Sequence, residues 1–198
     1  SSRFLPGRDE EARSRFALPG ERILLHISNF RPVKRVTDVI RIFAVVQREM
    51  PAKLLMVGDG VERFTAQHLA RELDIEKEVL FLSRQEDIPG LMKVADLFLL
   101  PSELESFGLA ALEAMSCEVP VIASRVGGLP EVIEDGVSGL LRPVGDVEGM
   151  AREALRVLAD GALHLRLAQA GRRRVLEHFD APRIIPHYEA LYRELLGE

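Results

Sequence analysis

Two glutamates, Glu105 and Glu113, lie eight positions apart in the stretch PSELESFGLAALEAMS, residues 101–116. Paired carboxylates are typical of glycoside hydrolases, whose two carboxyl groups lie about 5–9.5 Å apart. Eight residues of helix rise roughly 12 Å, so a pair carried by one helix would be too far apart to share a scissile bond. The helical pattern begins near Leu109. If Glu105 precedes that helix, the pair could instead bind two ends of one elongated ligand.

The residues between the two glutamates could bind such a ligand through the backbone. Ser106, Phe107, Gly108 and Leu109 stand at the predicted start of the helix, where N–H groups have no helical partner. Gly108 lets a ligand approach the backbone closely. Glu113 lies in an otherwise apolar helix, where a carboxylate needs hydrogen-bond donors, and ligand hydroxyls would supply them. A solvated glutamate is the alternative interpretation.

A basic cluster, Arg31, Lys34 and Arg35, comes directly after the first apolar run. Cations at the start of a helix oppose its macrodipole, so the placement is slightly unfavourable until an anion binds. A phosphate would be bound by both the cations and the exposed N–H groups. A solvated surface cluster is the competing interpretation.

A glycine turn, Gly58-Asp59-Gly60, follows the second apolar run. It resembles the start of a dinucleotide-binding fingerprint, but Arg63 stands where the third glycine would be. The pattern therefore argues against a nicotinamide-dependent oxidoreductase, and a simple turn needs no ligand.

These residues are connected by short apolar runs that alternate with helical patterns. The runs predict strands at 22–28, 53–58, 79–83, 97–100, 119–124 and 139–143, with helices near 36–50, 61–73, 87–94, 108–116, 146–159, 162–178 and 182–196. Continuous apolar strands separated by amphipathic helices imply a parallel sheet covered on both faces. Right-handed crossovers then give a doubly wound, Rossmann-like α/β domain of about six strands, whose ligands bind at the carboxyl ends of the strands.

Composition excludes several classes of protein. The 198 residues carry a formal charge of −5, which argues against a general nucleic-acid binder. The single cysteine, Cys117, excludes a disulfide framework and a cysteine-based zinc site. No apolar run approaches the roughly 18 residues of a membrane span, no signal peptide is visible, and a cytoplasmic location is expected. His26 is interpreted as a hydrogen-bonded core or rim histidine, Cys117 as a buried helix-end residue, and residues 172–174 as an exposed helix face.

The stretch PSELESFGLAALEAMSCEVPVIASRVGGLPEVIEDGVSGLL resembles the donor-binding region of retaining glycosyltransferases of the GT-B fold, family 4, whose E-x7-E motif matches Glu105 through Glu113. LLMVGDGVE and SNFRPVKR occupy the family's expected places upstream, and the resemblance runs from about residue 22 to the C-terminus. HISNFRPVKRVTDVI looks most like the subgroup that transfers N-acetylglucosamine to L-malate in bacillithiol synthesis.

The resemblance implies roles for the charged residues. Lys34, with Arg31, would hold the diphosphate of a UDP-sugar and neutralise charge on the leaving group. Glu105 would bind sugar hydroxyls, and Glu113 the ribose diol. The implied reaction is hexosyl transfer with retention of anomeric configuration and without a metal or other cofactor.

The remaining implied contacts come from backbone groups. Phe107, Gly108 and Leu109 would offer N–H groups to the sugar and phosphate, next to Ser106, and the loop near Arg84 would contact uracil. Gly58 and Gly60 belong to the same predicted site. The sequence departs from the family at two positions: Asn29 stands where many relatives carry arginine, and Glu118 where a glycine often ends the motif helix.

The resemblance covers only the C-terminal half of a two-domain enzyme. Residues 1–20 are then the remnant of an interdomain connection, and residues 21–198 a nucleotide-sugar donor-binding domain. The acceptor would be bound by a missing N-terminal domain, so the chain alone is expected to bind nucleotide weakly and to catalyse nothing. The last helix, 182–196, would contact that domain or mediate a homodimer. A UDP-sugar epimerase of GT-B shape and a non-catalytic nucleotide-sugar-binding module are the alternative functions.

Overall fold

A computed structural model describes residues 3–196. Residues 1–2 of the predicted connection (1–20) and residues 197–198 of the predicted domain (21–198) lie outside the described residues. Six parallel strands form one sheet in the order β3-β2-β1-β4-β5-β6. The strands are β1 (Arg22–Ile27), β2 (Ala52–Val57), β3 (Val79–Leu82), β4 (Leu97–Leu100), β5 (Val121–Ser124) and β6 (Leu140–Arg142). This is the predicted doubly wound sheet, with its order reversing between β1 and β4.

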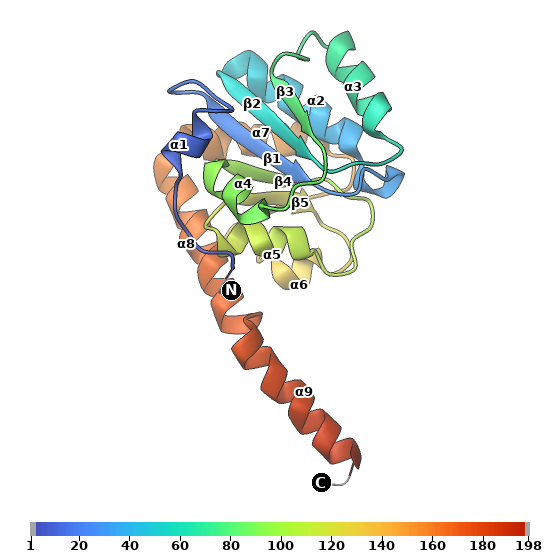
Figure 1. Cartoon of the computed structure of the whole chain (residues 1–198), viewed down its shortest axis with the longest axis vertical. Coiled ribbons are helices and arrows are strands. Elements are labelled where there is room, and N and C mark those ends of the chain that lie inside the picture. The colour runs from blue at the N-terminus through green and yellow to red at the C-terminus, as the bar shows by residue number, and fades with distance from the viewer. Residues whose placement is uncertain (1–2, 197–198) are drawn as a thin grey trace.

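Helices cover both faces of the sheet, as Figure 1 shows. One buried cluster lies under α2, α3 and α7, and a second lies under α4, α5 and α6. The helices are α1 (Glu10–Arg13), the 3-10 helix η1 (Pro32–Lys34), α2 (Val36–Glu49), α3 (Arg63–Glu72), α4 (Ile88–Val94), α5 (Leu109–Ser116), α6 (Leu129–Val132), α7 (Val147–Ala159), α8 (Gly161–His178) and α9 (Ala181–Leu196). All predicted helices are present, and the short α1, η1 and α6 are additional.

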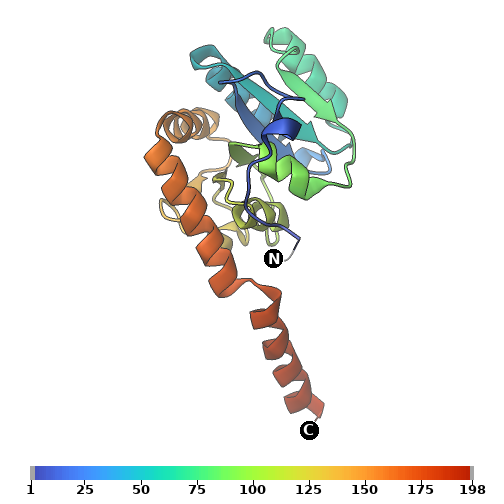
Figure 2. The same cartoon turned by 60° about the vertical axis from the view of Figure 1, so that its left-hand side comes forward.

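The final helix, α9, continues from the end of α8 and extends away from the sheet (Figures 1 and 2). No helix in the described part of the chain combines the length and apolarity needed to cross a membrane. The strand predicted from residue 119 begins two residues later, after Pro120, which has no N–H to donate to the sheet.

The interpretation of residues 172–174 as an exposed helix face is wrong for two of the three arginines. Arg174 donates from Nε to the Val132 carbonyl and from Nη2 to the Glu131 carbonyl, both at 2.8 Å. Arg172 donates to the Ser116 carbonyl. These arginines therefore satisfy the carbonyl groups of α5 and α6, which need partners at helix ends.

The end of α5 carries a residue in the left-handed conformation without being glycine. Glu118 has φ 60°, two residues after the last residue of the helix. A side chain costs roughly 1 kcal/mol at such a position. Glu118→Gly is therefore expected to raise the free energy of unfolding by about 1 kcal/mol in urea titrations.

The matched control for this change is Glu118→Ala. The alanine variant loses the same ion pair with Arg172, whose Nε lies 3.8 Å from the Glu118 carboxylate, but it keeps a Cβ at positive φ. Equal stability of the glycine and alanine variants would show that backbone conformation is not the cause.

Candidate functional site

Two adjoining cavities open at the carboxyl ends of the strands. The larger, about 570 Å³, lies over the ends of β1, β2 and β3, and the smaller, about 430 Å³, lies between β1 and the start of α5. They share Ile27, Ser28 and Asn29, which end and follow β1. The two volumes together can hold one elongated ligand that crosses the end of β1.

The smaller cavity contains an ion pair between Lys34 and Glu105. Lys34 Nζ donates to Glu105 Oε1, and Ser102 Oγ donates to the same oxygen at 3.2 Å. Only 19% of the Lys34 side chain and 13% of the Glu105 side chain are exposed. The structure thus places Glu105 in the loop before α5, directly against the predicted phosphate-binding lysine.

The start of α5 forms another wall of the smaller cavity, lined by Ser106, Phe107, Gly108 and Leu109. Gly108 precedes the helix with φ 87°, and no side chain among the described residues caps the helix start. A Cβ at Gly108 would lie 2.6 Å from Leu129 Cδ2 of α6. Only glycine therefore fits here, and the first N–H groups of α5 are left for a ligand.

The larger cavity depends on close contact between two loops. A Cβ at Gly58 would lie 1.9 Å from the Ser28 carbonyl oxygen, and one at Gly60 would lie 2.4 Å from the Asn29 carbonyl oxygen. Both glycines have positive φ. Arg63, in place of a third glycine, donates to the Gly58 carbonyl at 3.2 Å. The turn therefore holds the loop after β1 in place.

His26, in β1, is buried next to Ile27 and Ser28, which line both cavities. Its Nδ1 lies 2.9 Å from the Leu99 carbonyl oxygen, and its Nε2 lies 2.8 Å from Ser28 Oγ. Because a carbonyl only accepts, Nδ1 carries the proton and Nε2 accepts from Ser28. The prediction of a hydrogen-bonded core or rim histidine is confirmed.

The pKa of His26 is lowered from its ordinary 6.5 to about 4: burial lowers it most, the hydrogen bond to the Leu99 carbonyl opposes the shift, and the nearby Lys34 charge adds to it. The unfolded state then binds a proton between these pH values that the folded state does not. The free energy of unfolding is expected to fall, as pH drops from 6.5 towards 4, by up to about 1.4 kcal/mol per pH unit from this group.

Urea titrations of the wild type and His26→Gln at several pH values measure this contribution. The other titrating groups are common to both proteins, so the difference in slope belongs to His26. Identical slopes would contradict a neutral buried histidine.

Not every predicted residue reaches the cavities. Arg84 lines the larger one, but Arg31, Gly60 and Glu113 are absent from the described residues that line either. Arg31 is exposed before η1. Glu113 is half-buried on α5, where burial raises its pKa and the charge of Arg3 opposes that rise. Their binding roles stay predictions.

Sequence reasoning did not identify Arg3, which lines the larger cavity from the N-terminal segment. Nothing in the pattern of the first twenty residues singles this arginine out. Its position results from tertiary packing: Phe4 packs against the buried cluster under α4 to α6, and Arg3 Nη2 donates to the Glu86 carbonyl at 3.0 Å.

A family model described as "Glycosyl transferases group 1" matches residues 8–174. The match includes all six strands, the lining of the smaller cavity and, except for Arg3, the lining of the larger one. The chain belongs to the group 1 glycosyltransferases. The family membership predicted from the E-x7-E stretch is thereby confirmed, and so is its assignment to the sugar-transferring enzymes.

One curated relative matches most of the chain. The chain is 49% identical over 178 residues to N-acetyl-alpha-D-glucosaminyl L-malate synthase from Bacillus anthracis, covering 90% of the chain and 47% of that protein. The chain therefore spans about half the length of this curated relative.

Two solved structures show that the chain has the fold of a GT-B C-terminal domain. Sucrose-phosphate synthase from Thermosynechococcus elongatus superposes with a TM-score of 0.88 at 33% identity, over 99% of this chain and 50% of that one. HepE from Anabaena in complex with UDP and glucose superposes with a TM-score of 0.86 at 27% identity, over 93% of this chain and 51% of that one.

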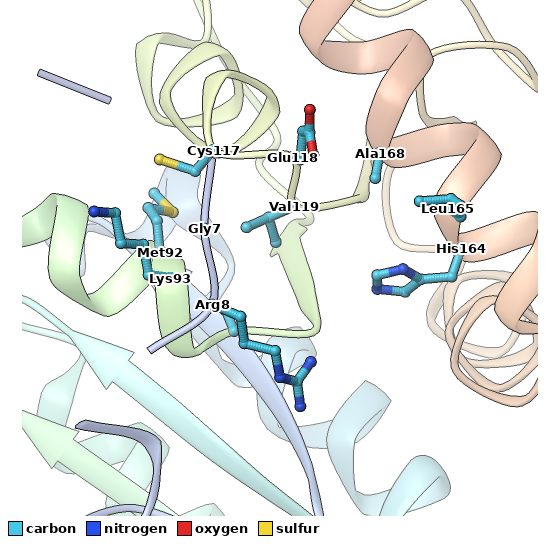
Figure 3. A pocket seen from close by; sticks show the side chains of 11 residues that line it. Gly7, Arg8, Met92, Lys93, Cys117, Glu118, Val119, His164, Leu165 and Ala168 are labelled. Carbon is cyan, nitrogen blue, oxygen red and sulfur yellow. The ribbon is translucent and has the colours of Figure 1, made fainter. Parts of the chain in front are cut away.

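A further cavity of about 320 Å³ lies at the opposite edge of the sheet of this glycosyltransferase domain, before β4 and β5 (Figure 3). Lys93 and Cys117 lie on one side of it and His164 of α8 on the other. Burial raises the pKa of the Cys117 thiol to about 11, so the thiol is protonated at neutral pH, and its predicted burial is confirmed.

Proposed function

We propose that this chain is the donor-binding part of a retaining glycosyltransferase that transfers N-acetylglucosamine from UDP-N-acetylglucosamine to L-malate. The observation that carries the proposal is the ion pair of Lys34 with Glu105 in a cavity walled by the uncapped start of α5. A cation, a hydroxyl-binding carboxylate and free N–H groups are the complementary partners of a sugar diphosphate.

In the transfer step, the bond between the anomeric carbon and the diphosphate oxygen breaks. Both electrons of that bond stay on the diphosphate, the acceptor hydroxyl oxygen bonds to the anomeric carbon, and the hydroxyl proton passes to the departing diphosphate oxygen. Lys34 neutralises the charge that develops on the leaving group, and the N–H groups of α5 add to this stabilisation. The step uses no metal ion, and Arg31 joins Lys34 on the diphosphate.

Glu105 changes partner when the donor binds. In the free chain its carboxylate accepts from Lys34 and Ser102. Once phosphate oxygens bind Lys34, the Glu105 carboxylate accepts hydrogen bonds from sugar hydroxyls, while Glu113 binds the ribose diol. Neither glutamate donates a proton, because the proton that the leaving diphosphate takes up comes from the acceptor hydroxyl.

The 49% identity to the Bacillus anthracis synthase supports N-acetylglucosamine as the sugar and L-malate as the acceptor. Because the chain spans 47% of that relative, we propose that the acceptor is bound by a second domain and that the chain alone does not turn over.

Titration of UDP, UDP-N-acetylglucosamine and GDP into the chain, followed by amide chemical shifts, tests the donor assignment. Shifts centred on residues 28–35, 58–60 and 105–113 are expected for the uridine nucleotides, with the largest response to the N-acetylated sugar. A response to GDP alone, or shifts confined to the opposite edge of the sheet, would contradict the assignment.

A chimera tests the acceptor. This chain replaces the matching half of the Bacillus anthracis relative, and product formation from UDP-N-acetylglucosamine and L-malate is measured. Glycosyl malate is expected from the chimera and not from the chain alone. Turnover by the chain alone would contradict the divided site, and release of free epimerised sugar would favour an epimerase.

A further inference from the structure

Arg3 lies where the N-terminal segment meets the larger cavity. Its Nη2 donates to the Glu86 carbonyl oxygen at 3.0 Å, 83 residues further along the chain. Two further contacts hold the N-terminal segment. Phe4 packs against the buried cluster under α4 to α6, and Arg8 Nη1 donates to Asp96 Oδ1 at 3.0 Å. The side chain of Arg3 is therefore held at the rim of the cavity.

Arg3 presents only hydrogen-bond donors. A guanidinium carries five N–H donors and no acceptor. Within residues 3–196, the Glu86 carbonyl is the one hydrogen-bond partner of Arg3, so further N–H groups are available to a ligand. The group of Arg3 that faces the cavity can pair with a carbonyl or another acceptor and repels an N–H donor.

The lining of the larger cavity suits a flat heterocycle. Ile27, Val57 and Ile88 give it an apolar surface, and Arg84, Gln85 and Glu86 come from the loop after β3. A base that rests on the apolar residues turns its polar edge towards the loop and towards Arg3, which is bonded to that loop.

Glu113, the proposed ribose-binding carboxylate, lies within the electrostatic reach of Arg3, which counteracts the effect of burial on the pKa of Glu113. Arg3 is therefore bonded to the loop proposed to contact the base, and its charge acts on the carboxylate proposed to bind the ribose. The base of a bound nucleoside would therefore lie beside Arg3.

We propose that Arg3 recognises the nucleobase of the donor, by donating to the C4 carbonyl oxygen of uracil, where cytosine carries an amino group that Arg3 repels. The inference rests on the proposed function and assigns base specificity to a residue of the N-terminal segment. Uracil and cytosine differ along one edge, where uracil has a C4 carbonyl oxygen and an N3–H group and cytosine has an amino group and an unprotonated N3, so UDP and CDP are otherwise matched ligands.

Calorimetric titration of UDP and CDP into the chain tests this. The wild type is expected to bind UDP more tightly than CDP. Arg3→Ala is expected to weaken UDP binding about 10-fold, as for the loss of one charge-assisted hydrogen bond, and to leave CDP binding unchanged or stronger, because the repulsion of the cytosine amino group is lost. Arg15→Ala, which removes an exposed arginine of the same segment, is the matched control and is expected to change neither affinity.

The outcomes separate the two proposals. Unchanged UDP binding by Arg3→Ala overturns the recognition of the base by Arg3. An equal loss of affinity for UDP and CDP also overturns it, because that would indicate a general charge effect. Failure of the wild type to bind UDP overturns the proposed function itself. The thermal midpoint of Arg3→Ala, expected to equal that of the wild type, shows whether a loss comes from unfolding.

Discussion

Replacing Lys34 with alanine is expected to weaken the binding of UDP to this chain about 10- to 100-fold. A hydrogen bond to a charged group contributes about 1.5–3 kcal/mol, and each 1.4 kcal/mol is a factor of ten in affinity. Lys34 is the cation in the smaller cavity, and its loss leaves the largely buried Glu105 carboxylate facing the phosphate. The repulsion adds to the lost attraction, so the effect lies towards the upper end of this range.

Lys53→Ala is the matched control for this variant. The Lys53 side chain is 20% exposed, against 19% for Lys34, and it also pairs with a glutamate, Glu21, with Nζ and Oε1 4.0 Å apart. Lys53 lies near the amino end of β2, at the other edge of the sheet. Its loss is expected to leave the UDP affinity unchanged in the same titration.

A second variant separates the two partners of the ion pair. Glu105→Gln releases Lys34 from its carboxylate, so UDP is expected to bind as tightly as before or more tightly. The preference for UDP-N-acetylglucosamine over UDP is expected to fall, because the amide is a weaker acceptor for sugar hydroxyls. Weaker UDP binding by Glu105→Gln, or unchanged binding by Lys34→Ala, would contradict the division of roles.

The sheet and the position of its ligand site could be predicted because they depend on local patterns. Apolar runs of four to six residues, such as LFLL at 97–100, can only be buried strands between helices. The carboxyl ends of parallel strands then define one edge, and Gly108 before an apolar helix marks a backbone-lined site there. Glu105 precedes that helix, which is the one of the two arrangements left open by the spacing in which the glutamates could bind two ends of one ligand.

The contacts between distant segments could not be predicted from those patterns. Lys34 and Glu105 are 71 residues apart, and either could have been a solvated surface charge. Arg63 stands in the sequence where a glycine is missing, yet it donates to the Gly58 carbonyl of the turn that it follows. Arg3 belongs to a charged, loop-like segment, and its direction depends on where Phe4 packs. Each of these positions is determined by tertiary packing.

Asp96 illustrates the same limit with a larger energetic consequence. In sequence it is an acidic residue before an apolar run, which is an ordinary position for a solvated side chain. In the structure its side chain is 1% exposed, and Oδ2 accepts from Arg13 Nη2 at 2.8 Å and from the Ile23 N–H at 2.7 Å. Arg13 also donates to the Val94 carbonyl at 2.7 Å. This buried pair fastens the segment that carries Arg3 to the sheet.

Asp96→Asn is therefore expected to lower the free energy of unfolding by about 3–5 kcal/mol in urea titrations. The amide has nearly the same shape, but it leaves the Arg13 guanidinium, whose side chain is 8% exposed, as an uncompensated buried charge. Glu148→Gln makes the same chemical change in an exposed pair, 89% exposed at the glutamate, and is expected to cost about 0.5 kcal/mol or less.

A double variant identifies the cause of this loss. If the cost of Asp96→Asn comes from the unpaired cation, then Arg13→Met in the same chain removes that cation and recovers much of the lost stability. The double variant would then lose much less stability than the sum of the two single losses, which is a large coupling energy between Asp96 and Arg13. Additive losses would mean instead that Asp96 acts through its other partners, the Ile23 N–H and Arg8. In that case the packing of Phe4 and the bond of Arg3 to the Glu86 carbonyl would hold the N-terminal segment, and Arg3 would keep its place at the cavity in the single variant.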